Sequence, residues 1–212
     1  MKIISSFLLC LACLQSMAQK TDIAFQGDTW VAPYTLRLPK GWGYERFLLP
    51  PEFASDLAFK GVEDLRFTPD WRNSKSDQYW TYAFLWYLDK KTTINERVLE
   101  NNLRLYYAGL VNSNLTKRQI PSQKILPTVT AIKRIKTYHG DLQTFSGTID
   151  MLDYMAQRPL RLHCIVHVMD YETPNRFFLF FEVSPKPLND RIWMDLDGLW
   201  VHFNAAKNLE TN

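Results

Sequence analysis

Two stretches of the chain repeat apolar residues at the spacing of an α-helix. The first begins at Thr93–Glu96, which fits a capping box. Its apolar stripe consists of Leu99, Leu103, Tyr106 and Leu110. The second runs from about residue 188 to residue 203, and its stripe consists of Ile192, Leu196, Leu199 and Phe203. Each stripe lies along one face of a helix, so both helices are predicted to pack on a sheet.

Elsewhere the apolar period falls to two, which is typical of β-strands. Residues 34–38 and 145–151 alternate between apolar and polar, as half-buried strands do. Residues 79–88 and 177–181 are apolar on both alternating sets, which predicts strands that are covered on both faces. Residues 162–168 are rich in β-branched side chains and predict a further strand. The short connections are marked by proline, which favours hairpins over crossovers.

These elements predict an α+β fold. We expect a mainly antiparallel central sheet covered by helices on its faces, which is a three-layer α/β/α sandwich. Residues 19–212 are predicted to form a single globular domain, because the chain contains no internal repeat. A domain of this length buries roughly 70% of its unfolded surface. The 7 Trp, 10 Tyr and 13 Phe residues supply the bulk of the predicted core.

The amino-terminal pattern predicts an export signal over residues 1–18. A positive charge precedes an apolar run at residues 7–14, and small residues precede a cleavage site after Ala18. Cys13 leaves a lipoprotein as an alternative. We therefore expect a secreted or periplasmic protein. The apolar run of the leader is shorter than the about 20 residues that span a bilayer, and no later stretch is free of charge for long enough, so we expect no transmembrane segment in the mature chain. Only Cys164 remains after cleavage, which excludes an intramolecular disulfide.

Two histidines provide the main candidates for chemistry. His163 and His167 have a spacing that would suit zinc on a helix, but on a strand they lie about 13 Å apart, so we expect no metal site and no cofactor. They share the more polar face of the predicted strand. If that strand pairs with the next one as a hairpin, Glu182 can join them in an acid–base site. Cys164 faces the opposite way and is expected to be a buried thiol with a raised pKa.

The charge pattern suggests an anionic partner. The net charge is only +3, yet the segment from Asn101 to Gly140 contains no Asp or Glu. If the end of the first helix lies beside the following strand, the basic residues of this segment form one surface that attracts anions. The candidate binding residues are Lys117, Arg118, Lys133, Arg134 and Lys136. Alternatively, acidic residues between Glu45 and Asp89 balance this charge in the folded protein.

One short motif adds a family resemblance. The predicted first strand ends in Leu38-Pro39-Lys40-Gly41-Trp42, and a middle helix, several antiparallel strands and a closing helix follow. This motif and this order of elements resemble the PsbP-like α/β/α family. The resemblance implies a non-enzymatic accessory or binding domain in an extracytoplasmic space.

The leading hypothesis is a secreted or periplasmic domain that binds a partner without catalysis. The partner would be an envelope protein, a glycan or an anionic lipid, and the mild charge argues against nucleic acid. One alternative is an extracytoplasmic hydrolase whose site contains His163, His167 and Glu182. A second alternative is a structural subunit of an envelope assembly.

Overall fold

The computed structural model describes residues 25–170 and 176–209, so the predicted signal peptide, residues 1–18, lies outside the described residues. Its helices are α1 (Glu96–Leu115) and α2 (Ile192–Leu209), with short 3₁₀ turns η1 (Glu52–Ala54) and η2 (Ser122–Lys124). Its strands are β1 (Gly43–Leu49), β2 (Gly61–Phe67), β3 (Tyr82–Leu88), β4 (Val129–Arg134), β5 (Gln143–Asp153), β6 (Arg158–Asp170) and β7 (Phe177–Ser184).

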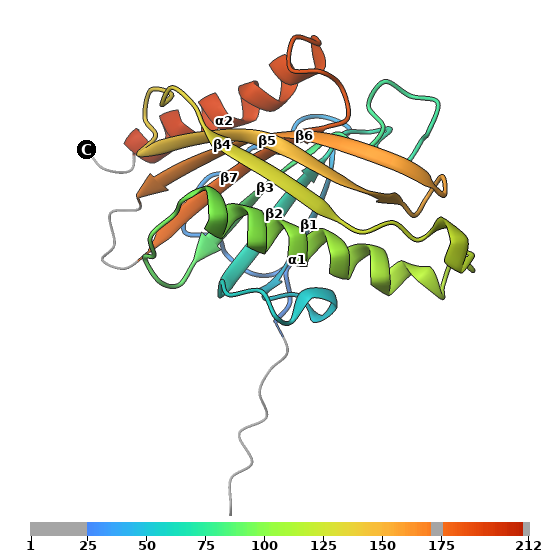
Figure 1. The fold of residues 1–212 in the computed structure, drawn as a ribbon. Coiled ribbons are helices and arrows are strands. Elements are labelled where there is room, and N and C mark those ends of the chain that lie inside the picture. Colours follow the sequence, from blue (N-terminus) through green and yellow to red (C-terminus); the bar gives the residue numbers. More distant parts are fainter. Residues whose placement is uncertain (1–24, 171–175, 210–212) are drawn as a thin grey trace, which may run out of the picture.

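All seven strands belong to one sheet in the order β1-β2-β3-β7-β6-β5-β4. Every neighbouring pair is antiparallel. The chain builds β1 to β3 as one run, crosses through α1, and returns from β4 to β7 as a second run (Figure 1). The last strand, β7, then pairs with β3 and joins the two runs at the centre of the sheet.

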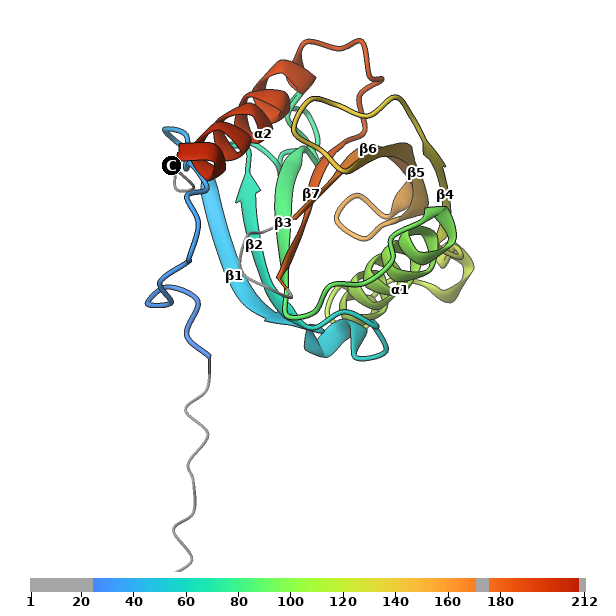
Figure 2. The same cartoon turned by 90° about the vertical axis from the view of Figure 1, so that its left-hand side faces the viewer.

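The expected three-layer α/β/α sandwich is wrong. The described chain is mostly one seven-stranded sheet, with only the two α-helices α1 and α2 beside it. Figure 2 shows that the sheet is strongly curved, with α1 inside the curve and α2 on the outer side. Antiparallel strands twist relative to one another, and this twist curls a sheet of many strands. The curled sheet wraps around α1 on its inner side and has only α2 on its outer side. Neither face therefore carries the flat layer of helices that a three-layer sandwich requires.

The inner face of the sheet packs against α1 as the apolar stripe predicts. Leu99, Leu103 and Tyr106 join the cluster of buried side chains that fills the curve. The helix begins later than the predicted capping box, since its N-cap is Asn95, whose side chain accepts a hydrogen bond from the backbone N–H of Val98 at 3.0 Å. This cap satisfies one of the free N–H groups of the first turn.

The outer face packs against α2, which starts at Ile192 and not near residue 188. The Asp190 carboxylate accepts a hydrogen bond from the Ile192 N–H at 3.0 Å, and a turn precedes it. Strand β3 supplies both faces, as its continuous apolar run predicts: Phe84 lies in the inner cluster and Leu85 in the outer one. The two clusters therefore share the central strands.

The predicted strand at residues 34–38 is absent from the sheet, although Tyr34 and Leu36 are buried on the outer face as the alternation predicts. The guanidinium of Arg66 donates hydrogen bonds to the backbone carbonyls of Leu36, at 2.9 Å, and Arg37, at 3.1 Å. These backbone carbonyls therefore accept hydrogen bonds from a side chain and not from the backbone of a neighbouring strand. The motif at residues 38–42 forms a turn before β1, so the first strand follows the motif instead of ending in it.

Candidate functional site

The β6–β7 hairpin brings His167 and Glu182 together, as the sequence suggests. The His167 Nε2 atom lies 3.3 Å from the Glu182 Oε1 atom, and its Nδ1 atom lies 2.9 Å from the Asp141 Oδ2 atom. All three side chains are at most 1% exposed. The imidazole therefore bridges two buried carboxylates, and we call these three residues the histidine cluster.

Helix α2 closes the histidine cluster from outside. The Trp200 ring stacks on the imidazole of His167 with 4.4 Å between centroids, and Tyr138 meets the same ring edge-on at 5.3 Å. Burial by itself lowers the pKa of His167, but the hydrogen bonds to Asp141 and Glu182 outweigh it and raise that pKa above its ordinary value. Burial raises the pKa of Glu182. A substrate would reach this cluster only if α2 moved.

His163 does not join the histidine cluster. It is half-buried and faces the same side of β6 as His167, opposite Thr148 of β5 and Ser184 of β7. Four residues of strand separate the two histidines by about 13 Å. Cys164 lies in the inner core, where burial raises the pKa of its thiol to about 12. Neither side chain offers a reactive group to the histidine cluster.

The predicted basic residues are exposed but form two groups. Lys117 and Arg118 follow the C-terminal end of α1, whereas Lys133 and Arg134 end β4 and Lys136 comes just after it. The backbone N–H of Ile132 in β4 donates to the Glu100 carboxylate, near the start of α1. The fifteen residues of helix from 100 to 115 alone correspond to about 22 Å. The acid-free segment therefore makes two separate patches, with an acidic side chain beside one of them.

A larger opening lies on the inner face, beside the first half of α1. This cavity, which we call the α1 cavity, has a volume of about 810 Å³. Its apolar lining includes Phe59, Leu88 and Val98, from the segment before β2, the end of β3, and α1. Asn102 fixes this wall: its side chain accepts from the Ala58 N–H at 3.1 Å and donates to the Val98 carbonyl at 2.8 Å.

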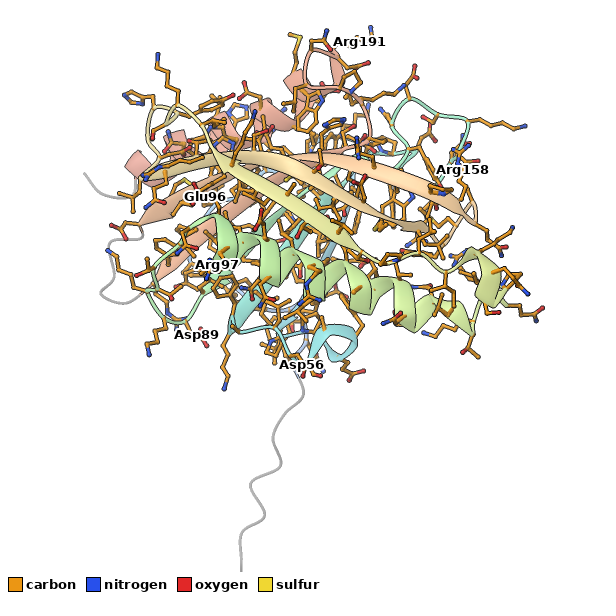
Figure 3. All side chains as sticks on the ribbon, in the orientation of Figure 1. Asp56, Asp89, Glu96, Arg97, Arg158 and Arg191 are labelled. Carbon is orange, nitrogen blue, oxygen red and sulfur yellow. The ribbon has the colours of Figure 1, made fainter. Side chains whose placement is uncertain are left out.

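The charged lining of the α1 cavity is mostly basic. Lys60, Lys90 and Arg97 line it, and none of the three forms an ion pair with a residue that the structure describes. The one acidic lining residue, Asp89, pairs with the guanidinium of Arg176. Figure 3 shows Asp89 and Arg97 at the same end of α1. The cavity thus combines an apolar wall with three uncompensated cations.

Sequence reasoning missed the residues of the α1 cavity. Lys60 precedes β2, Lys90 follows β3, and Arg97 is in the first turn of α1. They come together because β2 pairs with β3 and α1 then packs beside the same end of this pair. None of them lies in the acid-free segment. In the sequence these three charges are isolated from one another, so no pattern links them. Only the folded structure shows that they lie around one cavity and that none of them has an acidic partner among the described residues.

Within residues 25–170 and 176–209, no group of three His, Cys, Asp or Glu residues is arranged to hold a metal ion. Neither described helix combines the length and the apolar character that a membrane span requires. Comparison of the chain with protein-family models, with curated proteins and with solved structures found no match.

Proposed function

We propose that this protein is a non-catalytic binding domain whose α1 cavity holds an amphipathic anion. The observation that carries the proposal is the group of three cations, Lys60, Lys90 and Arg97, around an apolar wall. None of the three forms an ion pair with a described residue, and the acidic lining residue Asp89 is paired with Arg176. An acidic head group would lie against these cations, and an apolar body would contact Phe59 and Leu88.

The size and chemistry of the cavity support this class of ligand. Small-molecule sites commonly have volumes of about 300–1,000 Å³ and mostly apolar walls with a few polar groups that orient the ligand. A volume of about 810 Å³ falls within that range. Cations without partners attract an anion over several ångströms, and a low-dielectric wall strengthens the attraction.

Among the partners considered from the sequence, an anionic lipid or a fatty acid suits the α1 cavity better than a glycan, because the wall is apolar. A secreted or periplasmic location would give the domain access to such molecules, and the proposal agrees with the binding role that the PsbP-like resemblance implies. Both the location and the resemblance stay predictions.

The test uses two probes with one tail and opposite charges. Monomeric dodecanoate and dodecyltrimethylammonium are titrated into the protein by isothermal calorimetry. We expect saturable binding of dodecanoate, at least about tenfold tighter than that of the cation, since tenfold corresponds to only about 1.4 kcal/mol. Equal affinity for both probes would contradict the proposal.

Two charge-reversed proteins locate the site. Lys60→Glu combined with Arg97→Glu should weaken dodecanoate binding at least about tenfold, because two attractive contacts become repulsive. Lys133→Glu combined with Arg134→Glu is the matched control, since both residues are exposed but lie outside the α1 cavity. If the control weakens binding and the cavity variant does not, the basic end of β4 is the site and the cavity proposal is wrong.

A further inference from the structure

A second cavity lies on the same inner face and has a different character. It has a volume of about 170 Å³ and lies between the sheet and the second half of α1. Eight aromatic side chains line it, from β1, β2, β3, α1 and the connecting segments. We call it the aromatic cavity. It shares no lining residue with the α1 cavity, so the two are separate sites.

The polar atoms of its rings are largely engaged elsewhere. The Tyr106 hydroxyl donates to the Glu63 carboxylate at 2.8 Å, and the Trp80 Nε1 atom donates to the Asp153 carboxylate at 3.2 Å. The Tyr82 hydroxyl lies 2.6 Å from that of Tyr107. These three rings therefore present carbon to the cavity, which favours an apolar ring as the occupant.

The rim of the aromatic cavity is charged and open to solvent. Glu45 and Arg72 line it, are more than half exposed, and are 3.9 Å apart at their nearest charged atoms. The Arg72 guanidinium lies 4.6 Å from the Trp71 ring centre, and the Arg118 guanidinium lies 5.1 Å from that of Tyr154. Arg72 and Arg118 thus each lie over a ring that lines the cavity. They also cover the ring faces that would otherwise attract a cationic ligand.

We propose that the aromatic cavity binds one six-membered aromatic ring that carries a carboxylate. The ring would fill the cavity, whose volume is close to the roughly 150 Å³ that accepts benzene in an engineered protein core. The carboxylate would lie at the rim, where the guanidinium group of Arg72 can donate charge-assisted hydrogen bonds. A larger ligand would not fit below the rim.

The test compares phenylacetate with benzylamine and with acetate. Trp71 and Trp80 line the cavity, so occupancy should change the tryptophan fluorescence in a saturable way. We expect phenylacetate to bind about tenfold tighter than benzylamine, which has a ring and the wrong charge, and acetate to give no saturable change. Equal binding of phenylacetate and benzylamine, or the absence of saturation with phenylacetate, would overturn the proposal.

Three variants assign the binding to this cavity. Arg72→Glu reverses an exposed rim charge, so it should leave the fold intact and weaken phenylacetate binding about tenfold. Leu110→Trp places a larger side chain into the lining and should abolish binding, with circular dichroism as the check on folding. Arg97→Glu, in the other cavity, should leave phenylacetate binding unchanged. If only Arg97→Glu weakens it, phenylacetate binds in the α1 cavity and the aromatic cavity is not the site.

Discussion

The two faces of the sheet use their polar residues differently. On the outer face, His167, Asp141 and Glu182 are sealed under α2, and Arg66 forms a buried ion pair with Asp64. On the inner face, both cavities open beside α1, and charged side chains line each of them. The groove that α2 lines, with a volume of about 270 Å³, lies against residues 37–42.

This difference shows that chemically versatile residue types can be buried and paired with one another instead of being exposed to a ligand. The imidazole of the outer face pairs with two carboxylates, although the Asp141 Oδ1 atom has no hydrogen-bond partner among the described residues, and the buried guanidinium of Arg66 satisfies backbone carbonyls. Buried polar groups that pair in this way favour one packing arrangement. The inner face has the free charges and the space, which are what a ligand requires.

Replacing the imidazole of the histidine cluster should have the largest effect. His167→Leu removes the imidazole that two buried carboxylates share, and Asp141 keeps only its hydrogen bond from the Thr144 hydroxyl. Breaking a buried ionic group in this way costs about 3–5 kcal/mol of unfolding free energy. Urea denaturation at pH 7 measures the loss. His163→Leu is the matched control, because it changes a half-buried histidine on the same face of the same strand. Similar losses in both variants would show that the cluster does not hold α2 on the sheet.

The inner face also has a buried carboxyl, Glu63, and its pKa is governed mainly by burial. It is 0% exposed, accepts one hydrogen bond from Tyr106, and its second oxygen has no hydrogen-bond partner among the described residues. Burial raises its pKa from an ordinary 4.5 to about 8. The folded protein therefore binds this proton more tightly than the unfolded chain does. Its contribution to stability is complete below pH 4.5 and is lost as the pH rises towards 8.

The pH dependence of stability should reveal Glu63. Between those two pH values the free energy of unfolding should fall by about 1.4 kcal/mol per pH unit from this residue. Glu63→Gln removes that part of the slope and should make the protein more stable than the wild type at pH 9. Urea midpoints from pH 5 to 9 measure this. Glu45→Gln, at an exposed site on the neighbouring strand, should keep the wild-type slope. An unchanged slope in Glu63→Gln would mean that Glu63 is charged in the fold.

The periodic elements could be predicted from the sequence, but their ends could not. The stripe from Leu99 to Leu110 placed α1 correctly because its spacing reflects burial on one face. Thr93 and Asn95 are both good N-cap residues, so the local sequence does not choose between them. At residues 34–38 the alternation correctly indicated that Tyr34 and Leu36 are buried, whereas Leu38 is exposed. Backbone carbonyls of this segment accept hydrogen bonds from Arg66, about 30 residues further on, and not from a partner strand.

The histidine cluster and the two cavities were harder to predict from the sequence than the helices and strands. The contact of His167 with Glu182 followed from a hairpin, in which neighbouring positions are fixed by register. Asp141 reaches the same imidazole from the loop between β4 and β5, and nothing in the sequence indicates that contact. The cavities depend on how far α1 stands from the curved sheet. That separation is set by packing of many side chains, so no single motif indicates it.

A glycine on each helix gives a smaller and more direct comparison of the two faces. Gly109, in α1, lies so close to η1 that an added Cβ would be 1.9 Å from the carbonyl oxygen of Phe53. Gly109→Ala should therefore force α1 and η1 apart and cost about 1–3 kcal/mol. Thermal unfolding measures the loss, and an unchanged melting temperature would show that η1 moves freely. A second effect is expected on the aromatic cavity, which Phe53 lines: phenylacetate should bind more weakly.

The same substitution in α2 should have the opposite sign. An added Cβ at Gly198 would meet no atom within 4 Å, so Gly198→Ala introduces no clash. Alanine loses less backbone freedom than glycine on folding into a helix, and the unfolding free energy should rise by about 0.5–1 kcal/mol. Comparing the melting temperatures of Gly198→Ala and Gly109→Ala separates two effects. Helix propensity acts in both variants, whereas the close packing against η1 acts only in Gly109→Ala. A loss of stability in Gly198→Ala would contradict the open space that the structure shows around Gly198.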